Sequence, residues 1–275
     1  MAVAGFLRSL DSLAGLLGRQ TIHQVDLLRQ IVAFTLITLG VTVTQYRTAP
    51  QVIRPLIRQQ IVRSGIRLLP IIAFIGVALG LLIIGQTLRL LHQVGQMDLV
   101  GSLVVTVIVR ELAPLSAALV VLARVGTPTV VELGTARAQG EVEALEALGI
   151  DPIHYLVLPR VVGITVAVFA LSVFLLVFAV FSGWLVSVVA NLPLPLPEYL
   201  AQIVRALRWQ DFPLLAAKSL TFGGVGALIA CYQGLARPLR LEEVPGAATR
   251  TVAQSLVAFL VLDAVFLVVQ LLTIP

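Results

Sequence analysis

Charged residues are scarce in this chain. Asp, Glu, Lys and Arg together make up 12% of its 275 residues, whereas 59% of the residues are hydrophobic. An average soluble domain carries about 25% charged residues, roughly twice this share. The mean hydropathy is +1.02, and several apolar runs are long enough to cross the hydrocarbon of a bilayer. We therefore exclude an ordinary soluble protein and expect an all-α, polytopic membrane protein.

Other features are also missing from the sequence. A P-loop of the form G-x-x-x-x-G-K-[ST] does not occur, so ATP must bind another chain if it is used at all. The apolar runs contain neither an H-E-x-x-H metal motif nor a nucleophile with a base, which argues against an intramembrane enzyme. The single cysteine, Cys231, cannot form an intrachain disulfide. We expect no cofactor and no metal on this chain.

Five apolar stretches are long enough to span a bilayer core of about 30 Å. They run from Ile66 to Leu91, Leu99 to Ala123, Val161 to Leu192, Leu214 to Gly234 and Val252 to Thr273. A shorter stretch, Ile31 to Tyr46, contains four threonines and is interpreted as interfacial or re-entrant. The first twenty residues have the pattern of an amphipathic helix lying on the membrane. We accordingly divide the chain into N-terminal interfacial helices (1–60) and a transmembrane domain (61–275).

The distribution of arginine predicts the orientation. The net charge of +5 resides mainly in connecting segments, where it suits anionic lipid head groups better than nucleic acid. Arginines cluster before the first span, between the second and third, and between the fourth and fifth. By the positive-inside rule those segments are cytoplasmic. The N-terminus is then inside and the C-terminus outside.

Four ionisable residues interrupt the predicted spans: Arg110, Glu111, Lys218 and Asp263. Each costs about 2.5 to 3.5 kcal/mol near the centre of a spanning helix, so partners or water must offset the cost. One interpretation is a polar cluster in a substrate cavity, and the other is a set of buried ion pairs that fixes helix register. Because neighbouring residues on a helix point about 100° apart, Arg110 and Glu111 should face different partners. Pro114 should free a backbone carbonyl one turn earlier, near Arg110.

The segment from Thr127 to Pro152 is polar and favours one or two short helices. Thr127 and Pro128 resemble a helix start, and Gly149 and Pro152 resemble a stop. An apolar stripe and several charges lie on the second helix, which is either a docking lever or a surface helix. The stripe consists of Ala138, Val142, Leu145 and Leu148, and the charged residues are Arg137, Glu141, Glu143 and Glu146. Elsewhere, Gly76 and Gly80 form a small-xxx-small pair that predicts close helix packing.

A long run of short motifs extends through the second half of the chain and begins in the second predicted span. The motifs are Arg110-Glu-Leu-Ala-Pro114, Ala123-Arg-Val-Gly126, Glu132-Leu-Gly134, Ala144-Leu-Glu-Ala-Leu-Gly149, Asp151-Pro152, Leu158-Pro-Arg160, Lys218-Ser219, Ala248-Thr-Arg-Thr-Val252 and Leu262-Asp263. This run resembles the MlaE (YrbE) family of ABC-transporter permeases, and the likeness extends from about Arg54 to the end of the chain. The chain departs from the family at Ala113 and Ala123, where glycine is usual, and at Gln139-Gly140-Glu141.

The resemblance implies a homodimeric permease of the bacterial inner membrane that moves phospholipid or a related lipid. Its implied partners are a separate ABC ATPase that carries ATP and Mg, a periplasmic MCE-domain protein and a STAS-domain protein. The helix from Thr135 to Leu148 would be the coupling helix that enters a groove of the ATPase, and the coupling region as a whole covers about 135–149. The residues assigned to this coupling are Arg137, Glu141, Val142, Glu143, Leu145 and Glu146.

Two other functions fit parts of the pattern. A stand-alone, ion-coupled secondary transporter would use the intramembrane charges for ion coupling. Nucleotide dependence of transport separates that alternative from an ABC permease. A purely structural scaffold fits the five spans but leaves the four buried charges unexplained.

Overall fold

The structure, a computed structural model, describes residues 29–30, 33–38, 40, 50–190, 194–235 and 240–273. Every regular element in these ranges is a helix. Contacts divide the chain into two compact units, Met1–Tyr46 and Arg47–Pro275. The predicted boundary between residues 60 and 61 therefore falls inside the second unit, within helix α2 (Pro50–Ser64). The amphipathic helix predicted for the first twenty residues lies outside the described ranges.

In the first unit, the described part of the stretch from Ile31 to Tyr46 is helical. The hydroxyl of Thr38 donates a hydrogen bond to the carbonyl of Phe34 at 2.8 Å, one helical turn earlier. A threonine that bonds to its own helix in this way needs no other hydrogen-bond partner in an apolar setting. The rest of the predicted interfacial or re-entrant stretch lies outside the described residues.

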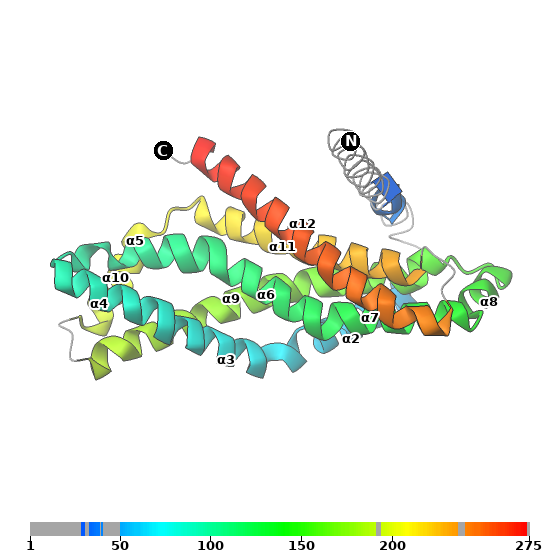
Figure 1. The fold of residues 1–275 in the computed structure, drawn as a ribbon, viewed down its shortest axis with the longest axis horizontal. Coiled ribbons are helices and arrows are strands. Elements are labelled where there is room, and N and C mark those ends of the chain that lie inside the picture. The colour runs from blue at the N-terminus through cyan, green and yellow to red at the C-terminus, as the bar shows by residue number, and fades with distance from the viewer. Residues whose placement is uncertain are drawn as a thin grey trace, which may run out of the picture. The chain divides into compact units, whose positions relative to one another are not determined.

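Among its described residues, the second unit contains five helices that are long and apolar enough to cross a membrane, which confirms the predicted number of spans. They cover Gln51–Val94, Met97–Ala138, Ile153–Val189, Asp211–Leu235 and Leu241–Leu272. Their long axes run side by side in Figure 1. The first consists of α2, a 3₁₀ turn η1 (Ile66–Leu68), α3 (Leu69–Leu79), a π segment η2 (Gly80–Ile84) and α4 (Gly85–Val94). The second begins with a 3₁₀ turn η3 (Met97–Leu99) and continues through α5 (Val100–Val104), η4 (Val105–Leu112), α6 (Ala113–Val121), η5 (Leu122–Gly126) and α7 (Thr127–Ala138).

The remaining spans are simpler. The third consists of a π segment η6 (Ile153–Val157) and α9 (Leu158–Val189). The fourth is α11 (Asp211–Leu235), and the fifth joins a 3₁₀ turn η7 (Leu241–Glu243) to α12 (Val244–Thr273). Two further helices, α8 (Glu141–Ala147) and α10 (Leu196–Ala206), connect spans. In Figure 1, α8 and α10 lie at opposite ends of the bundle formed by this unit.

Prolines and π segments occur together in the second and third spans. The π segments η4, η5 and η6 each end two residues before a proline, namely Pro114, Pro128 and Pro159. Proline lacks the N–H that an α-helix uses at that position, and a π turn bonds one residue further back. The helices therefore continue through these prolines. Helix α7 begins at Thr127 with Pro128 in its first turn, as predicted, but it follows η5 without a break and therefore continues the second span.

The predicted coupling helix from Thr135 to Leu148 is two helices instead of one. Gly140 adopts a left-handed conformation with φ of +78°, which ends α7 and starts the short helix α8. Gly149, with φ of +73°, follows the end of α8 and confirms the predicted stop signal. Side chains other than glycine rarely adopt these angles. Ala138 and Arg137 consequently belong to α7, whereas Val142 and Leu145 belong to α8.

Helix α10, between the third and fourth spans, is not among the helices predicted from the sequence. It is amphipathic, with Tyr199 and Ile203 buried. The Tyr199 hydroxyl donates to the carbonyl of Val180 on α9 at 3.2 Å. Burial raises the pKa of Tyr199, so the hydroxyl stays protonated and remains a donor at neutral pH. This bond holds α10 against the end of the third span.

The third span forms the centre of the unit, because α9 contacts α2, α3, α6 and α11. Gly76 and Gly80 face α9, as the small-xxx-small pattern predicts. A Cβ added at Gly80 would lie 2.0 Å from the Oγ of Ser182 and 2.2 Å from the carbonyl oxygen of Ala179. Only glycine permits this backbone approach. The Ser182 hydroxyl also donates to the carbonyl of Val77 at 3.2 Å, which links α9 to α3.

Candidate functional site

Lys218 is the only lysine in the chain, and it lies on α11 with a side chain that is 0% exposed. Its ammonium group contacts three oxygens: Glu111 Oε2 at 2.5 Å, Asp263 Oδ1 at 2.8 Å and the backbone carbonyl of Arg110 at 3.1 Å. The contacts with Glu111 and with the Arg110 carbonyl are hydrogen bonds, and the contact with Asp263 is an ion pair. Three spans meet here, because Glu111 lies on η4, Lys218 on α11 and Asp263 on α12. We call these three side chains the Lys218 cluster.

Pro114 explains why the backbone carbonyl of Arg110 is available to Lys218. In a regular α-helix the carbonyl of Arg110 would accept from the backbone N–H of residue 114, which proline lacks. The structure gives this carbonyl to Lys218 instead. A buried carbonyl without a partner would be costly in hydrocarbon. The freed carbonyl predicted from the sequence is thus confirmed, and its partner is the ammonium group of another span.

Arg110 does not join the Lys218 cluster. Its Nε lies 2.8 Å from Asp211 Oδ1, and its Nη2 donates to Asp211 Oδ2 at 3.4 Å. Asp211 is buried at the start of α11 and also accepts the backbone N–H of Arg208 at 2.8 Å. Arg110 and Glu111 therefore have different partners, as their helical spacing predicts. Both partners lie on α11, seven residues or two turns apart.

Sequence reasoning missed Asp211, because it stands just before an apolar stretch and reads as a loop residue. Its presence changes the charge of the site. The sequence suggested two balanced pairs, but Arg110 and Lys218 supply two positive charges against three carboxylates, those of Glu111, Asp211 and Asp263. The five groups together carry a formal charge of −1 when all are ionised.

The surplus negative charge is accessible. The side chains of Glu111 and Asp263 are 26% and 25% exposed, whereas Lys218 and Asp211 are fully covered. The surface of the site therefore presents carboxylate oxygens, which accept hydrogen bonds and attract cations. The site is thus suited to a ligand that carries a hydrogen-bond donor or a positive charge.

The residues predicted to contact an ATPase separate into two groups. Arg137 is partly buried at the end of α7, and its Nη1 donates to the carbonyl of Leu235, the last residue of α11. A cation that bonds to the last carbonyls of a helix stabilises that end. Glu141, Glu143 and Glu146 are instead exposed on α8, while Val142 is buried against the rest of the chain and Leu145 is partly buried. Only the glutamates offer a free surface.

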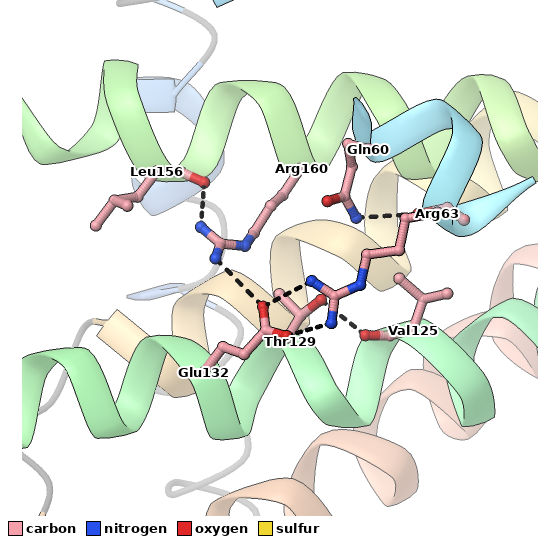
Figure 2. A network of polar contacts seen from close by, with 8 residues as sticks. Gln60, Arg63, Val125, Thr129, Glu132, Leu156 and Arg160 are labelled. Atoms are coloured by element: carbon pink, nitrogen blue, oxygen red, sulfur yellow. Dashed lines mark hydrogen bonds and ion pairs between the residues drawn. The ribbon is translucent and has the colours of Figure 1, made fainter. Parts of the chain in front are cut away.

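A second polar network joins three helices near α8. Figure 2 shows Glu132 of α7 between Arg63 of α2 and Arg160 of α9. Both nitrogens of the Arg63 fork bind Glu132, and Arg160 Nη2 lies 3.4 Å from Glu132 Oε2 while its Nη1 donates to the carbonyl of Leu156 at 2.9 Å. Sequence analysis did not pair these residues, because they are far apart in the chain. The network ties the amphipathic α2 to the second and third spans.

Comparison with known proteins identifies the family. The family model described as permease MlaE matches residues 57–269. The chain belongs to the MlaE permease family. A probable ABC transporter permease protein of Rickettsia typhi is 28% identical over 261 residues, which cover 95% of this chain and 98% of the relative. The chain is also similar to the chloroplastic protein TRIGALACTOSYLDIACYLGLYCEROL 1 of Arabidopsis thaliana, with 28% identity over 75% of this chain and 59% of the relative.

A further relative is a probable ABC transporter permease protein of Synechocystis, 32% identical over 61% of this chain and 63% of the relative. The matched region contains the Lys218 cluster, the Arg110–Asp211 pair and the Glu132 network. The predicted family is confirmed. This MlaE protein is a multi-span transporter permease, and its family and the names of its relatives indicate a transporter subunit rather than an enzyme.

Proposed function

We propose that this permease is the membrane subunit of an ATP-driven transporter that moves phospholipid or a related lipid. Two copies would pair with two copies of a separate ABC ATPase, which binds ATP and Mg. A periplasmic MCE-domain protein would exchange the lipid with the permease at the bacterial inner membrane, and a STAS-domain protein would bind the ATPase. Membership of the family and the names of the relatives support this assignment.

The observation that carries the lipid assignment is the Lys218 cluster. A neutral, wholly apolar cargo gives no reason to keep five charged side chains among membrane-spanning helices, where each is costly. An amphiphile with a charged head group gives such a reason. The accessible carboxylates of Glu111 and Asp263 and the surplus negative charge favour a head group that carries an ammonium group next to its phosphate. We therefore favour zwitterionic phospholipid over a neutral sterol.

The cluster also suggests how cargo binding would move the helices. A ligand ammonium group that binds Glu111 or Asp263 competes with Lys218 for the same oxygens. Lys218 would then keep fewer of its three acceptors, and the attraction between η4, α11 and α12 would weaken. Release of the head group would restore the bonds. The Lys218 cluster would thus link the binding of the head group to the separation of the second, fourth and fifth spans.

The short helix α8 is proposed as the contact with the ATPase. Its exposed acidic residues fit a groove that carries positive charge. Movement of α8 would reach α11 through α7, because Arg137 binds the carbonyl of Leu235 at the end of α11. Lys218 lies on that same helix. The arginines between the second and third spans support a cytoplasmic position for α8, and those before the first span support a cytoplasmic N-terminus.

Affinity capture of the tagged chain from its native membrane tests the assignment. Mass spectrometry of the captured material should identify an ABC ATPase, an MCE-domain protein and bound phospholipid. Recovery of the chain without an ATPase after gentle solubilisation would contradict it. A variant with Glu141, Glu143 and Glu146 changed to glutamine should lose the ATPase and keep the lipid, which separates the α8 contact from the cargo site.

An ion-coupled secondary transporter is the alternative, because intramembrane carboxylates also serve ion coupling. The two functions differ in their energy source. Lipid movement in vesicles that requires ATP and the partner ATPase supports the ABC permease. Movement driven by a proton or sodium gradient without the ATPase supports the alternative.

A further inference from the structure

A basic groove lies along α2, away from the Lys218 cluster. It has a volume of about 430 Å³ and is lined by Pro55, Arg58, Gln59, Val62, Arg63 and Arg67. Three of the six lining residues are arginines. The groove follows the part of the chain just before the first apolar stretch, where α2 ends at Ser64 and the 3₁₀ turn begins at Ile66. Arginines that flank an apolar span are typical of the membrane–water interface, where lipid head groups lie.

The charges of the groove are only partly neutralised. Arg63 binds Glu132, but Glu132 is shared with Arg160. Arg58 and Arg67 are exposed and have no carboxylate partner within the described ranges. One carboxylate, that of Glu132, therefore stands against four arginines, namely the three that line the groove and Arg160. This leaves a formal charge of +3. An anion is the ligand that such a surface favours.

Apolar side chains on the same surface narrow the choice of anion. Val62 is 37% exposed beside the arginines, and Ile66, directly before Arg67, is 59% exposed. A free inorganic anion gains nothing from these side chains, whereas an amphiphile covers them with its acyl chains. The chain's own first 49 residues are a poor occupant, because they carry four arginines and two aspartates and are themselves basic.

We propose that this groove binds the phosphate of an anionic phospholipid, with Arg58 and Arg67 as the principal contacts. The acyl chains lie against Val62 and Ile66. The lipid is a bound component at the membrane surface and is distinct from the cargo at the Lys218 cluster. Because the two sites have opposite charge, they select different head groups. The groove proposal does not depend on the nature of the transported substrate.

Native mass spectrometry of the full chain in detergent tests the groove. The probes are dioleoylphosphatidylglycerol, dioleoylphosphatidylcholine and inorganic phosphate, each added at defined concentration. The native chain should retain phosphatidylglycerol in preference to phosphatidylcholine. Changing Arg58→Gln and Arg67→Gln together should weaken that retention by about 30-fold, since each arginine near an anionic lipid surface contributes about 1 kcal/mol. Arg54→Gln is the matched control, because Arg54 is exposed on the same helix but does not line the groove.

Three results would overturn the proposal: equal retention of the two lipids, an equal loss in Arg54→Gln, or displacement of phosphatidylglycerol by millimolar phosphate as readily as by the lipid itself. The variant with Arg58→Lys and Arg67→Lys guards against a folding defect, and it should keep most of the binding because it keeps the charge. An excess of dioleoylphosphatidylcholine should leave phosphatidylglycerol retention by the native chain unchanged, because the two sites select different head groups. Displacement of phosphatidylglycerol by this zwitterionic lipid would mean that the anionic lipid occupies the cargo site.

Discussion

Replacing Lys218 by methionine should destabilise the permease strongly. Methionine keeps the length of the side chain but removes the ammonium group that binds Glu111, Asp263 and the Arg110 carbonyl. Removing one partner of a buried ion pair costs about 3 to 5 kcal/mol, because it leaves the other charge uncompensated. We expect the low end, about 3 kcal/mol, since both carboxylates are a quarter exposed. The midpoint of thermal unfolding should fall by about 6 to 12 °C at this chain length.

The same reasoning predicts a rescue. A triple variant with Glu111→Gln, Lys218→Met and Asp263→Asn has no uncompensated charge and should recover most of the lost stability. Thermal unfolding of the purified protein in detergent, followed by size-exclusion chromatography with fluorescence detection, measures all the variants. Arg89→Met, at an exposed position on α4, is the control and should change the midpoint little. A single variant as stable as the native chain, or a triple variant as unstable as the single one, would refute the reasoning.

Three further substitutions test other contacts by the same unfolding assay. Gly80→Ala should lower the free energy of unfolding by about 1 to 3 kcal/mol, because the new Cβ would lie 2.0 Å from a hydroxyl oxygen of α9. Gly224→Ala should be tolerated, because its Cβ would lie 3.6 Å from the nearest neighbouring atom. Equal effects of the two substitutions would count against the packing argument. Asp211→Asn should lower the free energy of unfolding by about 3 kcal/mol, because it leaves the buried guanidinium of Arg110 without a carboxylate. Asp98→Asn, at an exposed position, should change it little. Similar unfolding midpoints for the two variants would contradict the Arg110–Asp211 pair. Glu132→Gln should cost only about 1 kcal/mol or less, because its ion pairs are partly exposed, and a loss as large as that of Asp211→Asn would disagree with this view.

The number of spans followed from the sequence, because long apolar runs are decisive in a membrane protein. The ends of the helices did not. Backbone hydrogen bonding carries the second span beyond the apolar run to Ala138, and the π segments let helices continue through proline. Hydropathy measures only the solvent that surrounds a residue. It does not report where a helix with polar residues continues into water.

The candidate site was only partly predictable. Lys218, Glu111 and Asp263 stand out as charges within apolar runs, and the structure brings these three together. Arg110 stands out equally, but its partner Asp211 sits at the edge of a span, where an aspartate is unremarkable. The network of Arg63, Glu132 and Arg160 depends on contacts between distant segments, which no local pattern encodes. Arg137 likewise resembles a surface charge until the position of the α11 terminus is known.

The most direct test of the central claim is lipid movement in vesicles that contain the permease and the proposed partner ATPase. The native complex should move zwitterionic phospholipid only when ATP is supplied. Glu111→Gln should slow this movement about tenfold or more, because a hydrogen bond to a charged group contributes about 1.5 to 3 kcal/mol. The amount of folded permease should fall much less than the rate. Undiminished movement in the variant, or a rate that falls only in proportion to the folded permease, would contradict a role of the Lys218 cluster in cargo binding.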